Sequence, residues 1–284
     1  MERKQRSARG PGAARSRKAP ALAWPLPTEA RRTPLAPTSL ALVDILSQKS
    51  SLTIEDYVAG VSEYVQKQRS LTDGQRKSAQ IRLSNALAKA LLQEFHNKLA
   101  SMSQYAVAGE IRVAGALRAA QVDLVEFHPL DGLRLAVEIK PVNLAVGRAI
   151  WNRFGDVRVT AVNLHLKFPF AVVGGVLAIP TYEEVKRGGQ MVHKDTTHLI
   201  RRAIDRFDRA GGRRSEAEAA HLLEGVCVIA YNPETGRMEP DLPPKGRGLR
   251  WDEFIAEMVV AYEARFGTDV GDVTSRLDIN EESL

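Results

Sequence analysis

The sequence predicts an α/β protein in which helices flank a central mixed sheet. Three observations lead to this prediction: apolar residues recur at helical spacing in several segments, two strand-like segments meet at an Asp-Gly dipeptide, and one short apolar run is typical of a buried strand. The chain has 284 residues, of which 44% are hydrophobic, so it can bury the core of one large domain or of two small ones.

The net charge of +6 is concentrated near the N-terminus. Residues 1–40 hold nine Lys or Arg against two acidic residues, so the remaining 244 residues carry a net charge of −1. Six of the 14 prolines also lie in residues 1–40, and the absence of apolar periodicity predicts a disordered basic tail over residues 1–38. Such a tail can bind nucleic acid nonspecifically, act as a transit peptide, or result from a wrongly assigned start codon.

The composition excludes several classes of protein. The single cysteine, Cys227, excludes a disulfide framework and a multi-cysteine zinc site, and it favours a reducing, cytoplasmic location. The longest apolar run, residues 170–180, is about half as long as a membrane-spanning helix. The sequence also lacks glycine-rich phosphate loops and the serine hydrolase motif, so it does not support the use of ATP or NAD.

Residues 39–104 are predicted to form an N-terminal helical region. Apolar residues recur at helical spacing over 54–65, the segment LTDGQRKS is expected to break the pattern, and a longer helix is expected over 81–99. Residues 105–284 are predicted to form the main core with a C-terminal extension. The beginning of this core, SQYAVAGEIRVAGALRAA, is expected to be helical and to carry Glu110.

A β-hairpin is predicted around the dipeptide Asp131-Gly132, because a two-residue type I′ turn favours this pair. In that register Asp123 faces Lys140. Since side chains alternate with a period of two, Asp123, Glu138 and Lys140 share one face of the hairpin. The opposite face is predicted to be an aliphatic wall made of Val122, Leu124, Leu135, Val137 and Ile139.

The remaining elements alternate between helices and strands. A helix broken near Gly155 is expected after the hairpin, and the buried strand at 170–180 follows it. The segment from Lys186 to Arg214 carries nine Lys or Arg and three Asp, and it includes a helical stretch. A strand around Cys227 and an amphipathic helix over 251–266 complete the pattern.

The charged face of the hairpin has the composition of a site that cleaves phosphodiesters. Asp123 and Glu138 supply oxygen ligands of the kind that Mg²⁺ prefers, and the backbone carbonyl of Ile139 can add another. Lys140 points to the same side, so its ammonium can anchor the attacking water. The alternative is an ion-pair cluster on an exposed strand, worth under ~1 kcal/mol. The apolar surroundings in AVEIKP favour the functional interpretation, because unpaired charge there would be costly.

These residues resemble the PD-(D/E)XK nuclease superfamily, whose best-known members are type II restriction endonucleases. The resemblance covers residues 105–180, from the helix expected before the hairpin to the strand after it. It implies a restriction-endonuclease-like core with the element order αβββαβ, and Mg²⁺-dependent cleavage of DNA. By this resemblance Asp123, Glu138 and Lys140 are catalytic residues, and the two carboxylates are also metal ligands.

Two further positions bear on the resemblance. Glu110 matches a helix glutamate that many members place near the metal, which implies that it orients a ligand water or binds a second ion. The nominal proline of the family is absent, since Val122 precedes Asp123. That position varies freely within the superfamily.

Basic and polar residues beyond the hairpin are candidates for DNA binding. The helix after the hairpin carries Arg148, Asn152 and Arg153, which are suited to contact a phosphate backbone. Arg201 and Arg202 lie in the basic segment and form a second group of candidates. A solvated helix face is the competing interpretation, because runs of charge often have no other role.

The sequence therefore predicts a type II site-specific deoxyribonuclease that hydrolyses double-stranded DNA with Mg²⁺ as its cofactor. Cutting both strands of a palindrome calls for two active sites, so a homodimer is expected. No membrane partner is expected. A cognate DNA methyltransferase is expected as a genetic partner, since it would protect the host DNA. Two alternatives stay open: a repair or junction-resolving nuclease of the same fold, and a non-catalytic nucleic-acid-binding protein.

Overall fold

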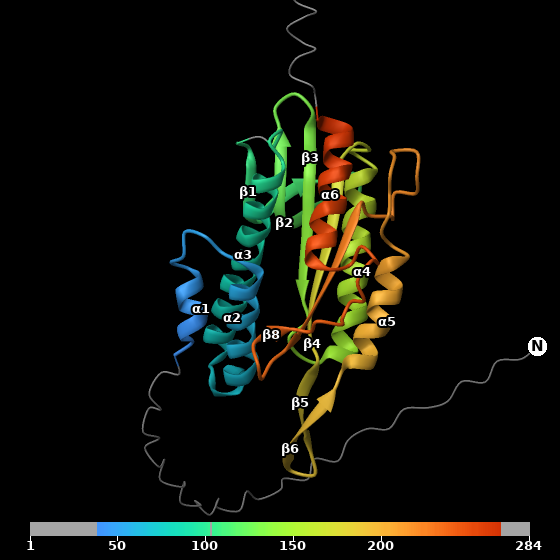
Figure 1. The fold of residues 1–284 in the computed structure, drawn as a ribbon. Helices are drawn as coiled ribbons and strands as arrows, with labels where there is room; N and C mark the ends of the chain where they lie inside the picture. Colours follow the sequence, from blue (N-terminus) through green and yellow to red (C-terminus); the bar gives the residue numbers. More distant parts are fainter. Residues whose placement is uncertain (1–38, 103, 268–284) are drawn as a thin grey trace, which may run out of the picture. The chain divides into compact units, whose positions relative to one another are not determined.

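The structure, a computed structural model, describes residues 39–102 and 104–267. The basic tail predicted over residues 1–38 lies outside the described residues. Within this part, a six-stranded mixed sheet lies between two layers of helices, which confirms the predicted α/β class (Figure 1). None of the helices described combines the length and the apolar character that crossing a bilayer requires.

An N-terminal run of helices is followed by groups of strands separated by single helices. The elements are α1 (Ala41–Leu46), α2 (Ile54–Lys67), the 3₁₀ helix η1 (Gln68–Ser70), α3 (Asp73–Lys98), β1 (Ala106–Ala114), β2 (Ala119–His128), β3 (Gly132–Pro141), α4 (Val146–His165), β4 (Val172–Pro180), β5 (Tyr182–Arg187), β6 (Gln190–Asp195), α5 (Thr197–Asp208), β7 (Gly225–Asn232), β8 (Arg237–Met238) and α6 (Trp251–Phe266).

The strands of the main sheet lie in the order β1-β2-β3-β4-β7-β8. The three central strands, β3, β4 and β7, run parallel, while the other neighbours pair antiparallel. β5 and β6 form a separate antiparallel hairpin, which the sequence analysis did not predict and which projects past the end of the sheet (Figure 1). The elements from α3 to β4 follow the order αβββαβ.

Each face of the sheet has its own hydrophobic core. One core joins α1, α2, α3 and α6 to the sheet, and it holds four residues of the predicted aliphatic wall, namely Leu124, Leu135, Val137 and Ile139. The other core joins α4 and α5 to the opposite face. Val122 was predicted to belong to the aliphatic wall, but it lies in this second core beside Val125. The pairing of β1 with β2 is irregular between Val122 and Leu124, so the simple alternation of sides does not continue through this point.

The hairpin register differs from the predicted one by two residues. Leu124 pairs with Val137 at the last regular position, so extending this register would bring Asp123 opposite Glu138 rather than Lys140. Because the difference is an even number of residues, the side of the sheet assigned to Glu138 and Lys140 does not change.

The turn of this hairpin explains the difference. The connection spans residues 129–131, not the dipeptide Asp131-Gly132 alone, because His128 already pairs with Gly132. Gly132 opens β3 with a φ of +73°, a conformation that glycine adopts without steric cost. A three-residue loop followed by a glycine with positive φ is a common hairpin connection, and the nearby shift in register accommodates it.

Glu110 lies on strand β1, which corrects the predicted helix. Gly109 and Glu110 stand opposite a single residue of β2, Asp123, so β1 contains a β-bulge. Gly109 has a φ of +132°. Residues other than glycine rarely adopt this backbone conformation, because their Cβ atom would clash with the backbone. Alanine-rich composition favoured the helix, but Ile111 and Val113 are β-branched and alternate, and their cross-strand pairing with β2 decides the outcome.

Two helices are longer than predicted. α3 begins at Asp73, because the Thr72 side chain accepts a hydrogen bond from the Gln75 backbone and the Gln75 side chain accepts one in return. The segment expected to break the pattern therefore forms the first turns of α3. α4 continues through Gly155, whose cost of about 1 kcal/mol in a helix is offset by burial of the apolar face against the sheet.

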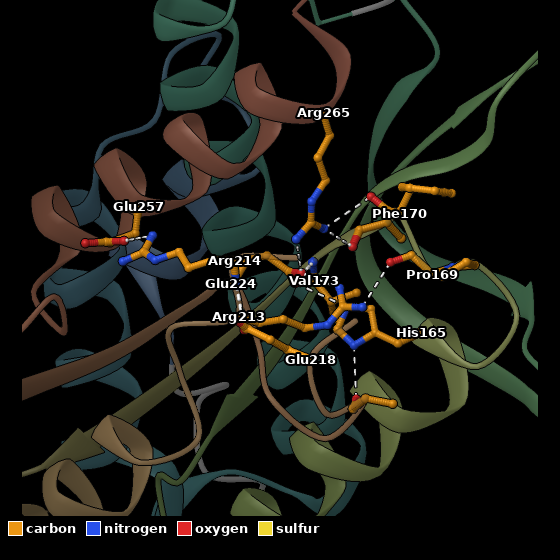
Figure 2. A network of polar contacts seen from close by, with 12 residues as sticks. His165, Pro169, Phe170, Val173, Arg213, Arg214, Glu218, Glu224, Glu257 and Arg265 are labelled. Carbon is orange, nitrogen blue, oxygen red and sulfur yellow. Dashed lines mark hydrogen bonds and ion pairs between the residues drawn. The ribbon is translucent and has the colours of Figure 1, made fainter. Parts of the chain in front are cut away.

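A buried glutamate joins five separate parts of the fold (Figure 2). Glu224, the residue immediately before β7, is only 1% exposed, and it accepts hydrogen bonds from Val173 N (2.8 Å) and Arg213 Nη1 (2.7 Å). It also contacts His165 Nε2 at 3.2 Å and Arg265 Nη2 at 2.7 Å. The network thus joins β4, β7, the loop after α5, the end of α4 and the end of α6.

The charges around Glu224 determine its ionisation. Burial raises the pKa of this carboxyl, but the hydrogen bond and charge of His165 and the charge of Arg265 lower it by more, so the pKa falls below its ordinary value of 4.5. Since the folded-state pKa is depressed, the carboxylate stabilises the fold fully above pH 4.5, and this contribution is lost as the pH falls through the folded-state value.

We expect Glu224→Gln to lower the free energy of unfolding at pH 7 by about 3 kcal/mol, because two arginines then lose the carboxylate that balances their buried charge. Urea denaturation at pH 7 and at pH 4 measures the effect, and the difference from wild type should shrink at the lower pH. Glu257→Gln is the matched control, since Glu257 pairs with Arg214 at the surface and its loss should cost under about 1 kcal/mol. Equal losses in the two variants would contradict the role assigned to Glu224.

Candidate active site

The strands β2 and β3 part at Asp123. The regular pairing reaches Leu124 and Val137, and beyond it the backbone N–H of Ile139 donates to Asp123 Oδ2 at 2.7 Å. The carboxylate thus takes the place of the next ladder hydrogen bond. This interaction fixes one oxygen of Asp123 beside the end of β3 and leaves the other available.

Glu138 is the most deeply buried of the predicted site residues, with 4% of its surface exposed. Its Oε1 contacts Lys140 Nζ, while its Oε2 is buried without a hydrogen-bond partner. Burial raises the pKa of Glu138 to about 7, with smaller upward contributions from Asp123 and Asp156, although Lys140 opposes the shift. A buried carboxylate with an unsatisfied oxygen is an acceptor that lacks a donor or a cation.

Asp123 shares the electrostatic environment of Glu138. Burial raises the pKa of Asp123, and the charge of Glu110 raises it further, while the Ile139 N–H and Lys140 lower it. The β-bulge of β1 explains the influence of Glu110, because it places this residue opposite Asp123. Bulges are frequent beside active sites, where they redirect a side chain. Glu110 itself is exposed, at the rim of the site.

Two neighbouring pockets open beside these residues. The larger has a volume of about 610 Å³ and is lined by Glu110, Asp123 and residues of α3 and of the segment after β3. The smaller, of about 290 Å³, is lined by Glu138 and by residues of β2 and α4. Lys140 and Arg153 line both pockets, so they lie where the two pockets adjoin.

The segment between β3 and α4 forms part of the larger pocket, and a residue of β5 holds it in place. Ala145 has a φ of +49° and gives the helix no side-chain cap. Glu183 supplies that function, because its Oε2 accepts a hydrogen bond from Val146 N at 2.9 Å, and its Oε1 accepts one from Lys194 at 2.8 Å. The β5–β6 hairpin therefore positions the start of α4 beside the site.

The predicted DNA-binding residues fall into separate groups. Arg153 lines both pockets and pairs with Asp156 at 3.1 Å, so it lies at the site. Arg148 and Asn152 are exposed on α4. Arg201 and Arg202 are exposed on α5 and line neither pocket. The structure thus brings Asp123, Glu138, Lys140, Glu110 and Arg153 together and leaves the α5 residues away from them.

Sequence reasoning missed two contributions to the site. Asp156 lines the smaller pocket with Glu138, one helical step of three residues from Arg153. Polar side chains of α3 line the larger pocket, and Gln80 and Ser84 recur there at a spacing of four residues. Both spacings were visible in the sequence, but only the fold shows that α3 and α4 flank the same end of β3.

A divalent cation fits this donor set. Asp123 and Glu138 offer carboxylate oxygens, one of which, on Glu138, is buried without a partner. Ile139 follows Glu138 in the chain, and its backbone N–H donates to Asp123, so its carbonyl belongs to the same region. Hard oxygen donors of this kind suit Mg²⁺. Among residues 39–102 and 104–267 no group of three or more His, Cys, Asp or Glu side chains is placed to hold a metal ion. A cation here would therefore complete its shell with water or substrate oxygens, as Mg²⁺ commonly does.

Neither a protein-family model, nor a curated protein, nor a solved structure matches the chain.

We expect Glu138→Gln to become more stable relative to wild type as the pH rises. The folded-state pKa of about 7 lies above the ordinary 4.5, so ionisation of Glu138 destabilises the fold progressively between these values. Between pH 5 and pH 8, the unfolding free energy of the variant should gain roughly 2 kcal/mol on wild type. Urea denaturation with EDTA present measures the difference. The exposed Glu216→Gln is the control, and the same pH trend in that variant would contradict the assignment.

Mg²⁺ is expected to stabilise wild type by binding the folded state only. Millimolar MgCl₂ at pH 8 should raise the melting temperature of wild type by a few degrees, and it should have little effect on Asp123→Asn or Glu138→Gln. Differential scanning fluorimetry gives the readout, with NaCl of equal ionic strength as the salt control. An equal rise in wild type and both variants would place the cation elsewhere.

Proposed function

We propose that the chain is a Mg²⁺-dependent endonuclease of the PD-(D/E)XK superfamily that hydrolyses phosphodiester bonds of double-stranded DNA. The observation that carries the proposal is the buried Glu138, with one oxygen held by Lys140 and the other without a partner, opposite Asp123 where two strands part. A carboxylate pair and a lysine in this arrangement are suited to hold a cation and a phosphate together.

The order of the elements supports this proposal. The succession α3, β1, β2, β3, α4 and β4 has the αβββαβ order that the resemblance implies. The parting of β2 and β3 also supplies the local geometry, since it opens the sheet at the position where the charged residues occur. Sites in α/β sheets commonly lie where the regular order of strands is interrupted.

Each residue has a distinct role in the proposed reaction. Asp123 and Glu138, together with the carbonyl of Ile139, would hold the cation. When bound, the cation neutralises charge that accumulates on the phosphate. Lys140 Nζ, which Glu138 Oε1 holds in position, would donate a hydrogen bond to the attacking water or to the scissile phosphate. Glu110, at the rim, would orient a ligand water, and Arg153 would bind a neighbouring phosphate oxygen.

Cleavage at a short specific sequence is the form of activity that we favour, as in a type II restriction enzyme. A homodimer would present two such sites to a palindrome. A protecting DNA methyltransferase would then be encoded nearby. Repair and junction-resolving nucleases of the same fold share these catalytic residues, so the substrate form decides between them.

One observation favours a second candidate, a nucleic-acid-binding protein without catalysis. Lys140 and Glu138 form a direct ion pair. A purely structural pair would have the same geometry, and it would need no cation. Cleavage assays with matched variants separate these two functions.

We expect purified protein with Mg²⁺ to cleave plasmid DNA, and Glu138→Ala and Lys140→Ala to lose at least about 100-fold in rate, because each removes a group that acts on the reacting phosphate. Gel electrophoresis gives the readout: discrete fragments indicate sequence-specific cutting, whereas branch-specific or general degradation indicates one of the other nucleases. Lys77→Ala, an exposed lysine on α3, is the control. Binding of DNA without any cleavage, or equal rates in all variants, would contradict the proposed nuclease.

A further inference from the structure

A second concentration of arginines lies between α4 and α5, away from the carboxylates. A shallow pocket of about 350 Å³ is lined by Phe154, Arg158, Arg206, Arg209 and Ala210. None of these residues lines either pocket of the candidate active site. α4 thus separates the two regions, with Arg153 and Asp156 on one flank and Phe154 and Arg158 on the other.

The arginines of this pocket have no anionic partner among the described residues. None of Arg158, Arg206 and Arg209 forms an ion pair within that part of the chain, and Arg158 Nε is buried without a hydrogen-bond partner. The acidic residues of α5 do not neutralise them, because Asp205 and Asp208 both pair with Arg247. Three cations converging without an anion repel one another, so an anion would bind there favourably.

Aromatic rings hold two of these guanidinium groups in place. Arg206 lies over the ring of Trp151, with 4.0 Å from its Cζ to the ring centre, and Arg202 lies over the same ring at 5.3 Å. Arg158 lies 5.8 Å from the centre of the Phe154 ring. A cation–π contact of this kind uses the face of the guanidinium and leaves its N–H donors free to bind in the plane. The pocket therefore presents guanidinium N–H groups that are already oriented, and paired N–H donors of this kind match the spacing of phosphate oxygens.

We propose that this α4–α5 pocket, defined by Phe154, Arg158, Arg206 and Arg209, binds a backbone phosphate of nucleic acid several nucleotides away from the cleaved bond. The inference deepens the proposed nuclease function and rests on it. A helix with its side chains is about 10–12 Å wide, and each nucleotide of a strand advances about 3.4 Å, so about three nucleotides or more separate the two phosphates. Contacts with phosphates fix the position of a duplex without reading its sequence.

The test measures binding rather than cleavage. The full chain is titrated in EDTA with a fluorescein-labelled duplex of 30 base pairs, and anisotropy is followed at several NaCl concentrations. Arg158→Ala and Arg209→Ala should each weaken binding about tenfold, because each removes a charged hydrogen bond. The slope of log affinity against log salt should also fall by about one, which is the loss of one phosphate contact.

The matched control is Arg237→Ala, which removes an exposed arginine of β8 that lies outside the pocket and the candidate active site. Its affinity and salt slope should equal those of wild type. Circular dichroism verifies folding of each variant, and Arg209→Ala tests the pocket even if the partly buried Arg158 proves necessary for folding. Equal affinities and slopes in Arg209→Ala and Arg237→Ala would overturn the proposal.

The binding of inorganic phosphate is measured in the same variants, because the pocket could take either free phosphate or the phosphate of nucleic acid. Weakened binding of inorganic phosphate in the pocket variants, with duplex binding unchanged, would overturn a nucleic-acid role for the pocket. The outcomes for the two proposals are also separate. Weakened duplex binding in a protein that never cleaves DNA supports the pocket and rejects the nuclease, whereas intact cleavage with unchanged binding in the pocket variants rejects the pocket alone.

Discussion

The ion network around Glu224 holds the two helical layers to the same point of the sheet. Its carboxylate is buried at the junction of β4 and β7, and Arg265 reaches it from α6 on one face, while His165 reaches it from α4 on the other (Figure 2). Arg213 adds the loop that follows α5. A charged group in this position is tolerated only because each oxygen has partners, so the layers cannot shift independently of one another.

The buried carboxylate of the candidate site, Glu138, differs from Glu224 in its hydrogen-bond partners and in the direction of its pKa shift. Glu224 is buried with partners on both oxygens, and its pKa is lowered, whereas Glu138 is buried with one oxygen unsatisfied, and its pKa is raised to about 7. Burial raises the pKa of both carboxyls, and only at Glu224 do the surrounding partners outweigh it. A hydrogen-bond donor or a cation at the free oxygen of Glu138 would relieve the cost of its burial.

The α/β class, the buried strand β4 and the helices α2, α5 and α6 could be predicted from periodicity, because each buries one apolar face. The side of the sheet that Glu138 and Lys140 share also followed from sequence, since the register was wrong by an even number of residues. The position of Asp123 did not follow in the same way, because the alternation of sides in β2 is interrupted there. Glu110 could not be placed, because composition favoured a helix and only pairing with β2 reveals the bulge. The β5–β6 hairpin and the pocket around Arg158 were missed because both depend on contacts between elements distant in sequence.

The bulge at Gly109 and Glu110 makes β1 unusual in how it would tolerate changes of length. One residue there is extra relative to β2, so Gly109 and Glu110 together stand opposite Asp123. Deleting one residue at this point would let β1 and β2 pair without interruption, with a single residue opposite Asp123. Deleting a residue elsewhere in β1 would instead shift the pairing by one residue and turn part of the strand over. The effect of a length change in β1 therefore depends on where in the strand it occurs.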